Sequence, residues 1–256
     1  MGLATMQFYS NAIGKHTSYN VIVPEVGEGP FPVLIQLHGL TDDYQAWVQR
    51  SNIVRHAAEY PMVIVFPDGG THFYTNWKDG GRIGKGGYED LIVVDIPNHV
   101  RRHFNVTDGP WAIGGLSMGG YGSLKLGMKH PDLFASIWSH SAKIESTGEG
   151  LDLSLVADRA DAEIIEHARR LLGRERRPVL SFDCGTEDEG LIDENRRLHA
   201  QLEEIGLEHH YAEHAGGHEW DYWDLHVREA LEQHARVLGI ERTRPDWARE
   251  EGPIGE

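Results

Sequence analysis

A serine lies at the centre of a short glycine-rich motif near the middle of the chain. The motif is Gly115-Leu116-Ser117-Met118-Gly119, which follows the apolar run 111–114 and precedes a helix-like stretch over 121–129. The spacing Gly-x-Ser-x-Gly is typical of a sharp turn from a strand into a helix, which strains the backbone of the serine. Such a turn exposes the Ser117 hydroxyl at a helix N-terminus, where backbone N–H groups favour developing negative charge. The pattern predicts a nucleophile for acyl transfer.

The alternative interpretation of this motif is purely structural, a glycine-rich turn in which Ser117 caps a helix. The context favours the nucleophile, because an apolar strand precedes the motif and a helix follows it. Gly120 and Gly122 also keep the first helical turn thin enough to pack closely on a sheet.

A histidine and several acids follow the serine in the chain order Ser, Asp/Glu, His of a catalytic triad. His218 lies in the glycine-rich loop 215–220 after the last expected strand, and it would act as the general base. An acid near the loop 184–190 would orient this histidine. The candidates are Asp183, Glu187, Asp188 and Asp193. Glu187 and Asp188 are better placed, because they lie in the loop, whereas Asp183 lies on a strand and Asp193 within a helix.

A strand that ends in His38-Gly39-Leu40 offers a second element of this chemistry. Ligands collect beyond the carboxyl ends of parallel strands, and a glycine there allows a backbone N–H to face the site. The N–H groups of Leu40 and Met118 would together form an oxyanion hole. The alternative is an ordinary strand-ending glycine beside a buried histidine.

Substrate contacts are expected from loops near the serine. The segment 71–87 is irregular and rich in glycine and aromatic residues, and loops of this length are usually functional or disordered. The candidate substrate-binding residues are His38, Trp77 and Trp220. Residues 80–86 superficially resemble a phosphate loop, but they lack the order Gly, four residues, Gly-Lys-Ser/Thr. We therefore expect no nucleotide cofactor.

The elements that must position these residues alternate between strands and helices. The expected strands are 5–13, 19–24, 31–37, 61–67, 111–114, 134–138, 178–183 and 208–213. The expected helices are 44–58, 88–104 with a kink at Pro97, 121–129, 160–172, 191–205 and 220–238. This order predicts an α/β fold, with a mostly parallel sheet covered by helices on both faces and an antiparallel edge formed by the first two strands.

The length of 256 residues suits one large α/β domain. We expect this domain to span 1–240, with a small cap-like excursion at about 141–178 and a polar C-terminal tail over 241–256. Cys184 is the single cysteine, so no disulfide can form within the chain.

Composition limits the partners. Lys and Arg total 24 against 40 Asp and Glu, a formal charge of −16, which argues against nucleic acid or an anionic membrane. No basic start precedes an apolar stretch, and no run reaches about 18 apolar residues, so we expect a soluble, cytoplasmic protein. His218-Glu219 lacks the following histidine of a zinc-protease helix, so we expect no metal and no other cofactor. The sequence does not decide whether homo-oligomers form.

Three motifs together resemble the esterase D family of α/β-hydrolases, which includes tributyrin-type and acetyl esterases, S-formylglutathione hydrolases and the antigen 85 mycolyltransferases. They are the serine motif continued through 115–126 with 130–134, the stretch Cys-Gly-Thr-Glu-Asp over 184–188 with 195–197, and Gly-Gly-His-Glu-Trp-Asp-Tyr-Trp over 216–223. The resemblance covers roughly residues 5–240 and is closest to the tributyrin-type branch. It weakens over 71–87 and 141–178, the segments that would set substrate choice.

The resemblance implies an α/β-hydrolase fold with Ser117 as nucleophile, Asp188 as acid and His218 as base. It also implies Leu40 and Met118 as oxyanion donors. The expected activity is that of a serine carboxylesterase that hydrolyses short-chain, acetyl-like esters through an acyl-enzyme, with a small-molecule ester as partner. The alternatives are a thioester hydrolase of the S-formylglutathione kind, an acyltransferase, and a catalytically inactive binding module of the same fold.

Overall fold

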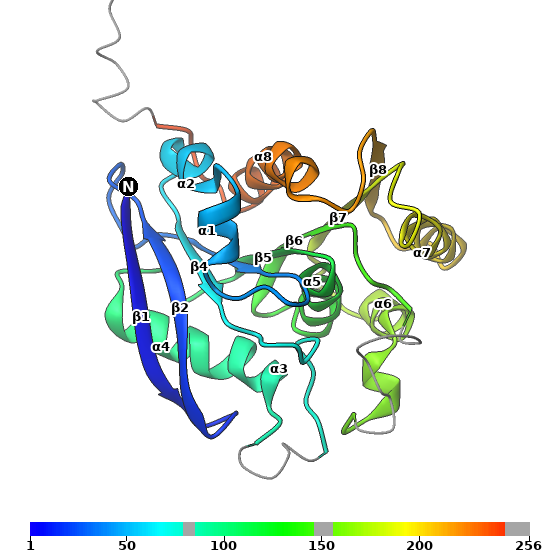
Figure 1. Ribbon diagram of the computed structural model, residues 1–256, viewed down its shortest axis with the longest axis horizontal. Helices are drawn as coiled ribbons and strands as arrows, with labels where there is room; N and C mark the ends of the chain where they lie inside the picture. Colours follow the sequence, from blue (N-terminus) through cyan, green and yellow to red (C-terminus); the bar gives the residue numbers. More distant parts are fainter. Residues whose placement is uncertain (79–84, 146–155, 244–256) are drawn as a thin grey trace, which may run out of the picture.

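An eight-stranded sheet forms the centre of the protein (Figure 1). The structure is a computed structural model, which describes residues 1–78, 85–145 and 156–243. The strands lie in the order β1-β2-β4-β3-β5-β6-β7-β8. Their bounds are β1 Gly2–Ser10, β2 Lys15–Val23, β3 Val33–Leu37, β4 Val63–Pro67, β5 Trp111–Leu116, β6 Phe134–His140, β7 Val179–Gly185 and β8 His210–His214. β1 and β2 are antiparallel to their neighbours and the other pairings are parallel, as expected.

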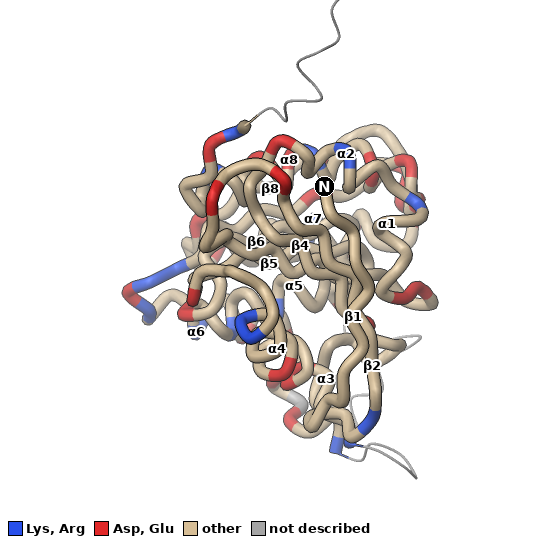
Figure 2. Tube along the Cα trace, turned by 90° about the vertical axis from the view of Figure 1, so that its left-hand side faces the viewer, with Lys and Arg blue, Asp and Glu red and all other residues tan. Residues whose placement is uncertain are grey.

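The central strands are buried on both faces. Every residue of β3, β4 and β5 is buried, which explains the continuous apolar runs of these segments. Figure 2 shows no charged residue along β4, β5 or β6, whereas most Asp, Glu, Lys and Arg lie on helices and loops. Burial in the middle of the sheet therefore accounts for the strands that the sequence predicts most clearly.

The turn between the first two strands lies earlier than expected. The sequence indicates a turn over 14–18, but Lys15 already belongs to β2 and pairs with Ser10. Gly14 has φ +67°, so this glycine takes the left-handed position of a tight turn. The polar residues after it begin β2, which lies between β1 and β4, and two of them, Lys15 and His16, are exposed.

Helices cover both faces of the sheet and enclose two separate hydrophobic cores (Figure 1). One face carries α1 (Ala46–Arg50), α2 (Ile53–His56) and α8 (Trp220–Val237). The other carries α4 (Ile96–His103), α5 (Met118–Lys129), α6 (Ile164–Leu172) and α7 (Ile192–Glu204). Successive strand side chains point into opposite cores. Leu34 packs into the core beneath α1, α2 and α8, and Ile35 packs into the core beneath α4 to α7.

Two of the expected helices are interrupted. The helix expected over 44–58 is divided into α1, α2 and the 3₁₀ turn η1 (Ala57–Glu59), because Ser51 is extended and Asn52 bonds to Asp224 of α8. The helix expected over 88–104 consists of α3 (Tyr88–Asp90), the π-helical turn η2 (Leu91–Asp95) and α4. Pro97, which has no backbone N–H to donate, is the second residue of α4 and directly follows the π-helical turn. Long-range contacts explain the first break and local chemistry the second.

Parts of the expected domain plan lie outside the described residues. These are 146–155 of the cap-like excursion, 79–84 of the aromatic loop and 244–256 of the tail. The described remainder of the excursion includes the 3₁₀ turn η3 (Arg159–Ala162) and α6, and Tyr121 of α5 donates a hydrogen bond to the Ala162 carbonyl at 2.8 Å. Within the described ranges, no helix is both long and apolar enough to cross a membrane.

Candidate active site

Ser117 occupies the junction between β5 and α5 in a strained backbone conformation. Its φ of 53° and ψ of −115° place it in a region that side chains other than glycine rarely adopt. The Ser117 N–H donates to the His140 carbonyl of the neighbouring strand at 2.9 Å, which holds the strained turn in place. This is the geometry expected of the Gly-x-Ser-x-Gly motif.

The two outer glycines of the motif are required by close packing. A Cβ on Gly119 would lie 2.6 Å from the carbonyl oxygens of Leu37 and His38, at the end of β3. A Cβ on Gly115 would lie 2.3 Å from the Gly119 carbonyl oxygen. Both positions are therefore closed to larger residues, and α5 can approach the sheet closely enough to present Ser117 beside the end of β3.

A chain of hydrogen bonds links Ser117 to a histidine and an acid from distant parts of the sequence. The Ser117 Oγ lies 3.0 Å from Nε2 of His218, and Nδ1 of His218 lies 2.7 Å from Oδ2 of Asp188. Asp188 is 3% exposed, whereas the His218 side chain is 37% exposed. The Trp223 ring contacts His218 edge-on at a centroid distance of 4.9 Å. The acid is thus enclosed, while the face of the site at Ser117 remains open.

The structure separates the four acids that the sequence leaves open. Among the described residues, Asp188 alone of these four bonds to His218. Asp183 is fully buried and accepts hydrogen bonds from Trp138, His140 and Tyr222. Burial by itself would raise the pKa of Asp183, but the adjacent His140 and these hydrogen bonds hold that pKa below its ordinary value. Asp183 is therefore a structural anion beneath the site.

The proposed oxyanion donors lie at the start of α5 and at the end of β3. The Met118 N–H belongs to the first residue of α5, where no partner exists within the helix. No hydrogen bond between described residues uses the N–H of Leu40 or of Met118 as donor. Both donors are consequently available to a substrate oxygen beside Ser117.

His38 is placed behind the site rather than in it, so its expected role in substrate binding is wrong. It is 1% exposed, its Nδ1 lies 2.7 Å from the Gly39 carbonyl oxygen, and its Nε2 accepts from the Gly69 N–H at 2.9 Å. Burial lowers the pKa of His38, which favours the neutral ring that this pair of bonds requires. The Tyr74 hydroxyl also donates to the His38 carbonyl at 2.9 Å. His38 therefore holds the Gly39 turn.

A pocket of about 360 Å³ opens beside the triad. It is lined by Gly39, Leu40, Thr41, Asp42, Arg50, Leu116, Ser117, His218, Glu219, Trp220 and Trp223. Of the aromatic candidates, Trp220 lines this pocket, with Arg50 at 6.0 Å from its ring centroid. Trp77 does not, since it packs against the core and donates to the His72 carbonyl, so its assignment to substrate binding is not supported.

Sequence reasoning missed Trp223 and Arg50 as pocket residues. Trp223 follows Trp220 by three positions on α8, so the helical period places both indoles on one side of that helix. That spacing is a signal that the sequence does carry. Arg50 reaches the pocket from α1, and only the tertiary fold brings it there.

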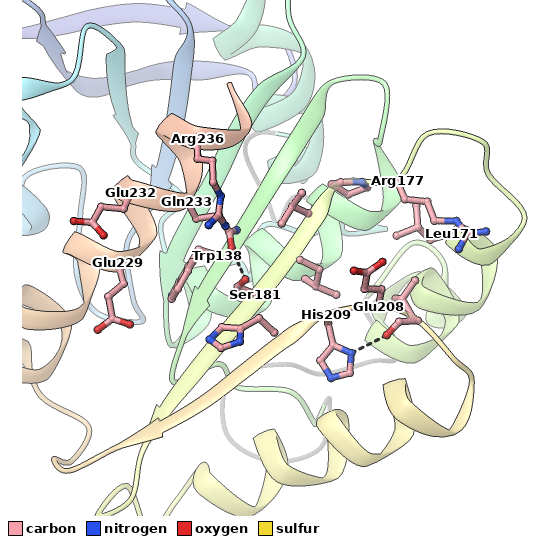
Figure 3. A pocket seen from close by; sticks show the side chains of 15 residues that line it. Trp138, Leu171, Arg177, Ser181, Glu208, His209, Glu229, Glu232, Gln233 and Arg236 are labelled. Carbon is pink, nitrogen blue, oxygen red and sulfur yellow. Dashed lines mark hydrogen bonds between the residues drawn. The ribbon is translucent and has the colours of Figure 1, made fainter. Parts of the chain in front are cut away.

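A second pocket, of about 610 Å³, lies elsewhere (Figure 3). It is formed around the first residues of β7 and β8, whereas Asp188 and His218 follow the ends of these strands. Trp138, Ser181 and Gln233 line it together with charged residues of α8. It therefore lies at the amino ends of these parallel strands, whereas the triad lies at their carboxyl ends.

The fold and the serine-centred site define an α/β-hydrolase, and comparisons with known proteins agree. The Esterase family model, described as "Putative esterase", matches residues 10–234. An acetyl esterase from Caldicellulosiruptor saccharolyticus is 26% identical over 273 residues, covering 93% of this chain and 99% of that protein.

Solved structures show the same architecture. A fluorophosphonate-binding serine hydrolase from Staphylococcus aureus matches with a TM-score of 0.80 and 21% identity, covering 91% of this chain and 98% of its own. An S-formylglutathione hydrolase from Staphylococcus aureus matches with a TM-score of 0.78 and 24% identity, covering 91% and 99%. The chain belongs to the Esterase family, and the protein is a serine esterase.

Proposed function

We propose that the protein hydrolyses short-chain, acetyl-like acyl esters through an acyl-enzyme on Ser117. The observation that carries this proposal is the continuous chain of hydrogen bonds from Ser117 through His218 to the buried Asp188. The acetyl esterase relative supports the choice of a short acyl group. The modest pocket beside the serine, bounded by Trp220 and Trp223, supports it as well.

The geometry gives each group one task. Nδ1–H of His218 donates to Asp188, which leaves Nε2 to take the Ser117 proton as Oγ attacks the ester carbonyl. The N–H groups of Leu40 and Met118 stabilise the oxyanion of the tetrahedral intermediate. The C–O bond to the alcohol then breaks, and Nε2–H of His218 protonates the departing alcohol.

Water completes the reaction. It attacks the acyl-enzyme carbonyl while His218 accepts its proton, and the same two N–H groups hold the second oxyanion. Collapse of this intermediate releases the carboxylic acid and returns the proton to Ser117. Because the open face of His218 adjoins the pocket, water can reach the acyl carbon without displacing the enclosed Asp188.

The test is hydrolysis of p-nitrophenyl acetate, butyrate and octanoate by the wild-type protein and Ser117→Ala. We expect serine-dependent turnover that falls with acyl length, and a loss in kcat of roughly 10⁶-fold in Ser117→Ala, because the triad acts as a unit. Octanoate turned over as fast as acetate would contradict the short-chain assignment. No turnover by folded wild-type protein would favour an inactive binding module instead.

A thioester is the second candidate substrate, because the fold matches that of an S-formylglutathione hydrolase over 91% of this chain. The same attack would then expel a thiol in place of an alcohol. S-formylglutathione assayed beside p-nitrophenyl acetate separates the two, and a higher kcat/KM for the thioester would replace the ester as the substrate class. Acyl transfer would appear as partitioning of the acyl group to an added alcohol.

A further inference from the structure

A group of metal-ligating side chains lies outside the triad, where the end of β8 meets α8. The group consists of His214, the last residue of β8, and of His226 and Glu229 on one turn of α8. One donor atom from each of the three side chains lies within 4.8 Å of the other two. The triad mechanism uses none of these residues.

The contacts within this group leave Nε2 of His214 without a hydrogen-bond partner. Nδ1 of His226 lies 2.9 Å from Glu229 Oε1. Nε2 of His214 lies 3.8 Å from Glu229 Oε2, too far for a hydrogen bond, and it is shielded from solvent with no hydrogen-bond partner in the described structure. A shielded polar atom without a partner is unfavourable, and a metal ion on its lone pair would satisfy it.

The donor types select a class of ion. Two imidazole nitrogens and one carboxylate are ligands for late first-row divalent ions such as Zn²⁺, whereas Ca²⁺ and Mg²⁺ prefer oxygen ligands. Three protein ligands leave a fourth position for water. Glu229 also lines the large pocket near the amino ends of β7 and β8, so its carboxylate is reached from solvent (Figure 3).

Binding requires a modest rearrangement. The rings of His214 and His226 are stacked, with centroids 4.1 Å apart and 18° between planes, and ligation needs one ring to turn from this stack. His226 is 8% exposed and fixed, but the side chains of His214 and Glu229 are 31% and 45% exposed. The two more exposed side chains can therefore adjust to an ion held about 2.0–2.2 Å from each donor.

We propose that His214, His226 and Glu229 bind one Zn²⁺-class ion, which ties the end of β8 to α8. These two elements flank the loop that carries His218. The His214 carbonyl already accepts from the Thr186 N–H at 2.8 Å, and the Gly216 carbonyl accepts from the Glu187 N–H at 2.9 Å. The ion would thus stabilise the joined loops of the acid and the base without touching substrate. This inference does not depend on the proposed substrate.

The experiment compares zinc binding by the metal-free full chain and two variants, His214→Gln and Glu229→Gln, using calorimetric titration and thermal unfolding with and without Zn²⁺. The control is Glu203→Gln, because Glu203 also pairs with a histidine on a helix, at 3.7 Å from His199. The chain has 16 histidines, and some of them can bind Zn²⁺ elsewhere. The decisive quantity is therefore the difference in bound Zn²⁺ between the wild type and each variant, not the total amount bound.

We expect the wild-type protein and Glu203→Gln to bind one more equivalent of Zn²⁺ than His214→Gln, and to show a zinc-dependent rise in Tm that His214→Gln lacks. Glu229→Gln should weaken this equivalent by at least roughly 100-fold, since even indirect partners of a ligand contribute roughly 10–100-fold. Circular dichroism verifies that each variant is folded. Equal stoichiometry and equal Tm shifts in all four proteins would mean adventitious binding only and would overturn the proposal.

Discussion

At the scale of single residues, we propose that Asp188 orients His218, whose Nδ1 lies 2.7 Å from its carboxylate. Asp188→Asn should leave the fold intact but lower kcat by roughly 10⁴-fold, because an amide favours the wrong tautomer of the histidine. Steady-state kinetics with p-nitrophenyl acetate measure this. The matched control is Asp193→Asn, which changes an exposed acid only five residues away and should retain activity. Equal losses in both variants would remove Asp188 from the triad.

Gly119 tests the packing that presents the nucleophile. Gly119→Ala should reduce both activity and Tm, because the new Cβ would lie 2.6 Å from two backbone carbonyl oxygens that have no room to move. Gly173→Ala is the control, since its Cβ would meet only the Arg170 carbonyl at 3.7 Å. If thermal unfolding shows no difference between the two variants, the close approach of α5 to β3 is not needed.

At the scale of elements, a buried ion network joins α3, α5 and η3. Lys125 is fully buried and lies 2.9 Å from Glu89 and 3.2 Å from Asp161, and Lys129 contacts both acids. Burial would raise the pKa of Glu89, but His130, Lys125 and Lys129 together hold that pKa well below its ordinary value of 4.5. This network secures α5, the helix that begins beside the nucleophile.

The depressed pKa of Glu89 fixes the direction of a pH effect. A carboxylate with a lower pKa in the folded state contributes stability above the unfolded pKa, and that contribution is lost as pH falls through the folded value. Wild-type stability should therefore decline below about pH 4.5, the ordinary value for this group. Glu89→Gln should be less stable at neutral pH. Its free energy of unfolding, measured by urea unfolding, should fall less than that of the wild type as the pH is lowered. Glu203→Gln, at an exposed site, should match wild type, and parallel acid limbs in all three proteins would contradict this assignment.

At the scale of the whole molecule, the sequence predicts the sheet and the order of the triad because both depend on local patterns. Continuous apolar runs mark β3, β4 and β5, and the glycines around Ser117 mark the strained turn. The roles of His38 and Trp77 could not be read in this way, since a histidine at a strand end is compatible with either a pocket or a buried turn. In this structure His38 accepts a hydrogen bond from the Gly69 N–H, which places its ring in the buried turn.

Features that depend on distant contacts also escape the sequence. The break between α1 and α2 requires Asp224, which lies 172 residues after Asn52. His214 and His226 stack only because the fold brings β8 and α8 together. The expectation of no metal considers local motifs alone and therefore could not include this pair. The sequence thus predicts the candidate triad better than it predicts the contacts that support it.

The most direct test of the central claim is the site of covalent modification. Wild-type protein, treated with a fluorophosphonate and digested, should carry one adduct on the peptide that contains Ser117. Among the described residues, this hydroxyl alone has the hydrogen-bonded partner His218 and the available N–H groups of Leu40 and Met118. Ser117→Ala should remain unlabelled, and His218→Gln should label far more slowly. Folded wild-type protein that stays unmodified, or that is labelled equally well after Ser117 is replaced, would contradict the assignment of Ser117 as nucleophile.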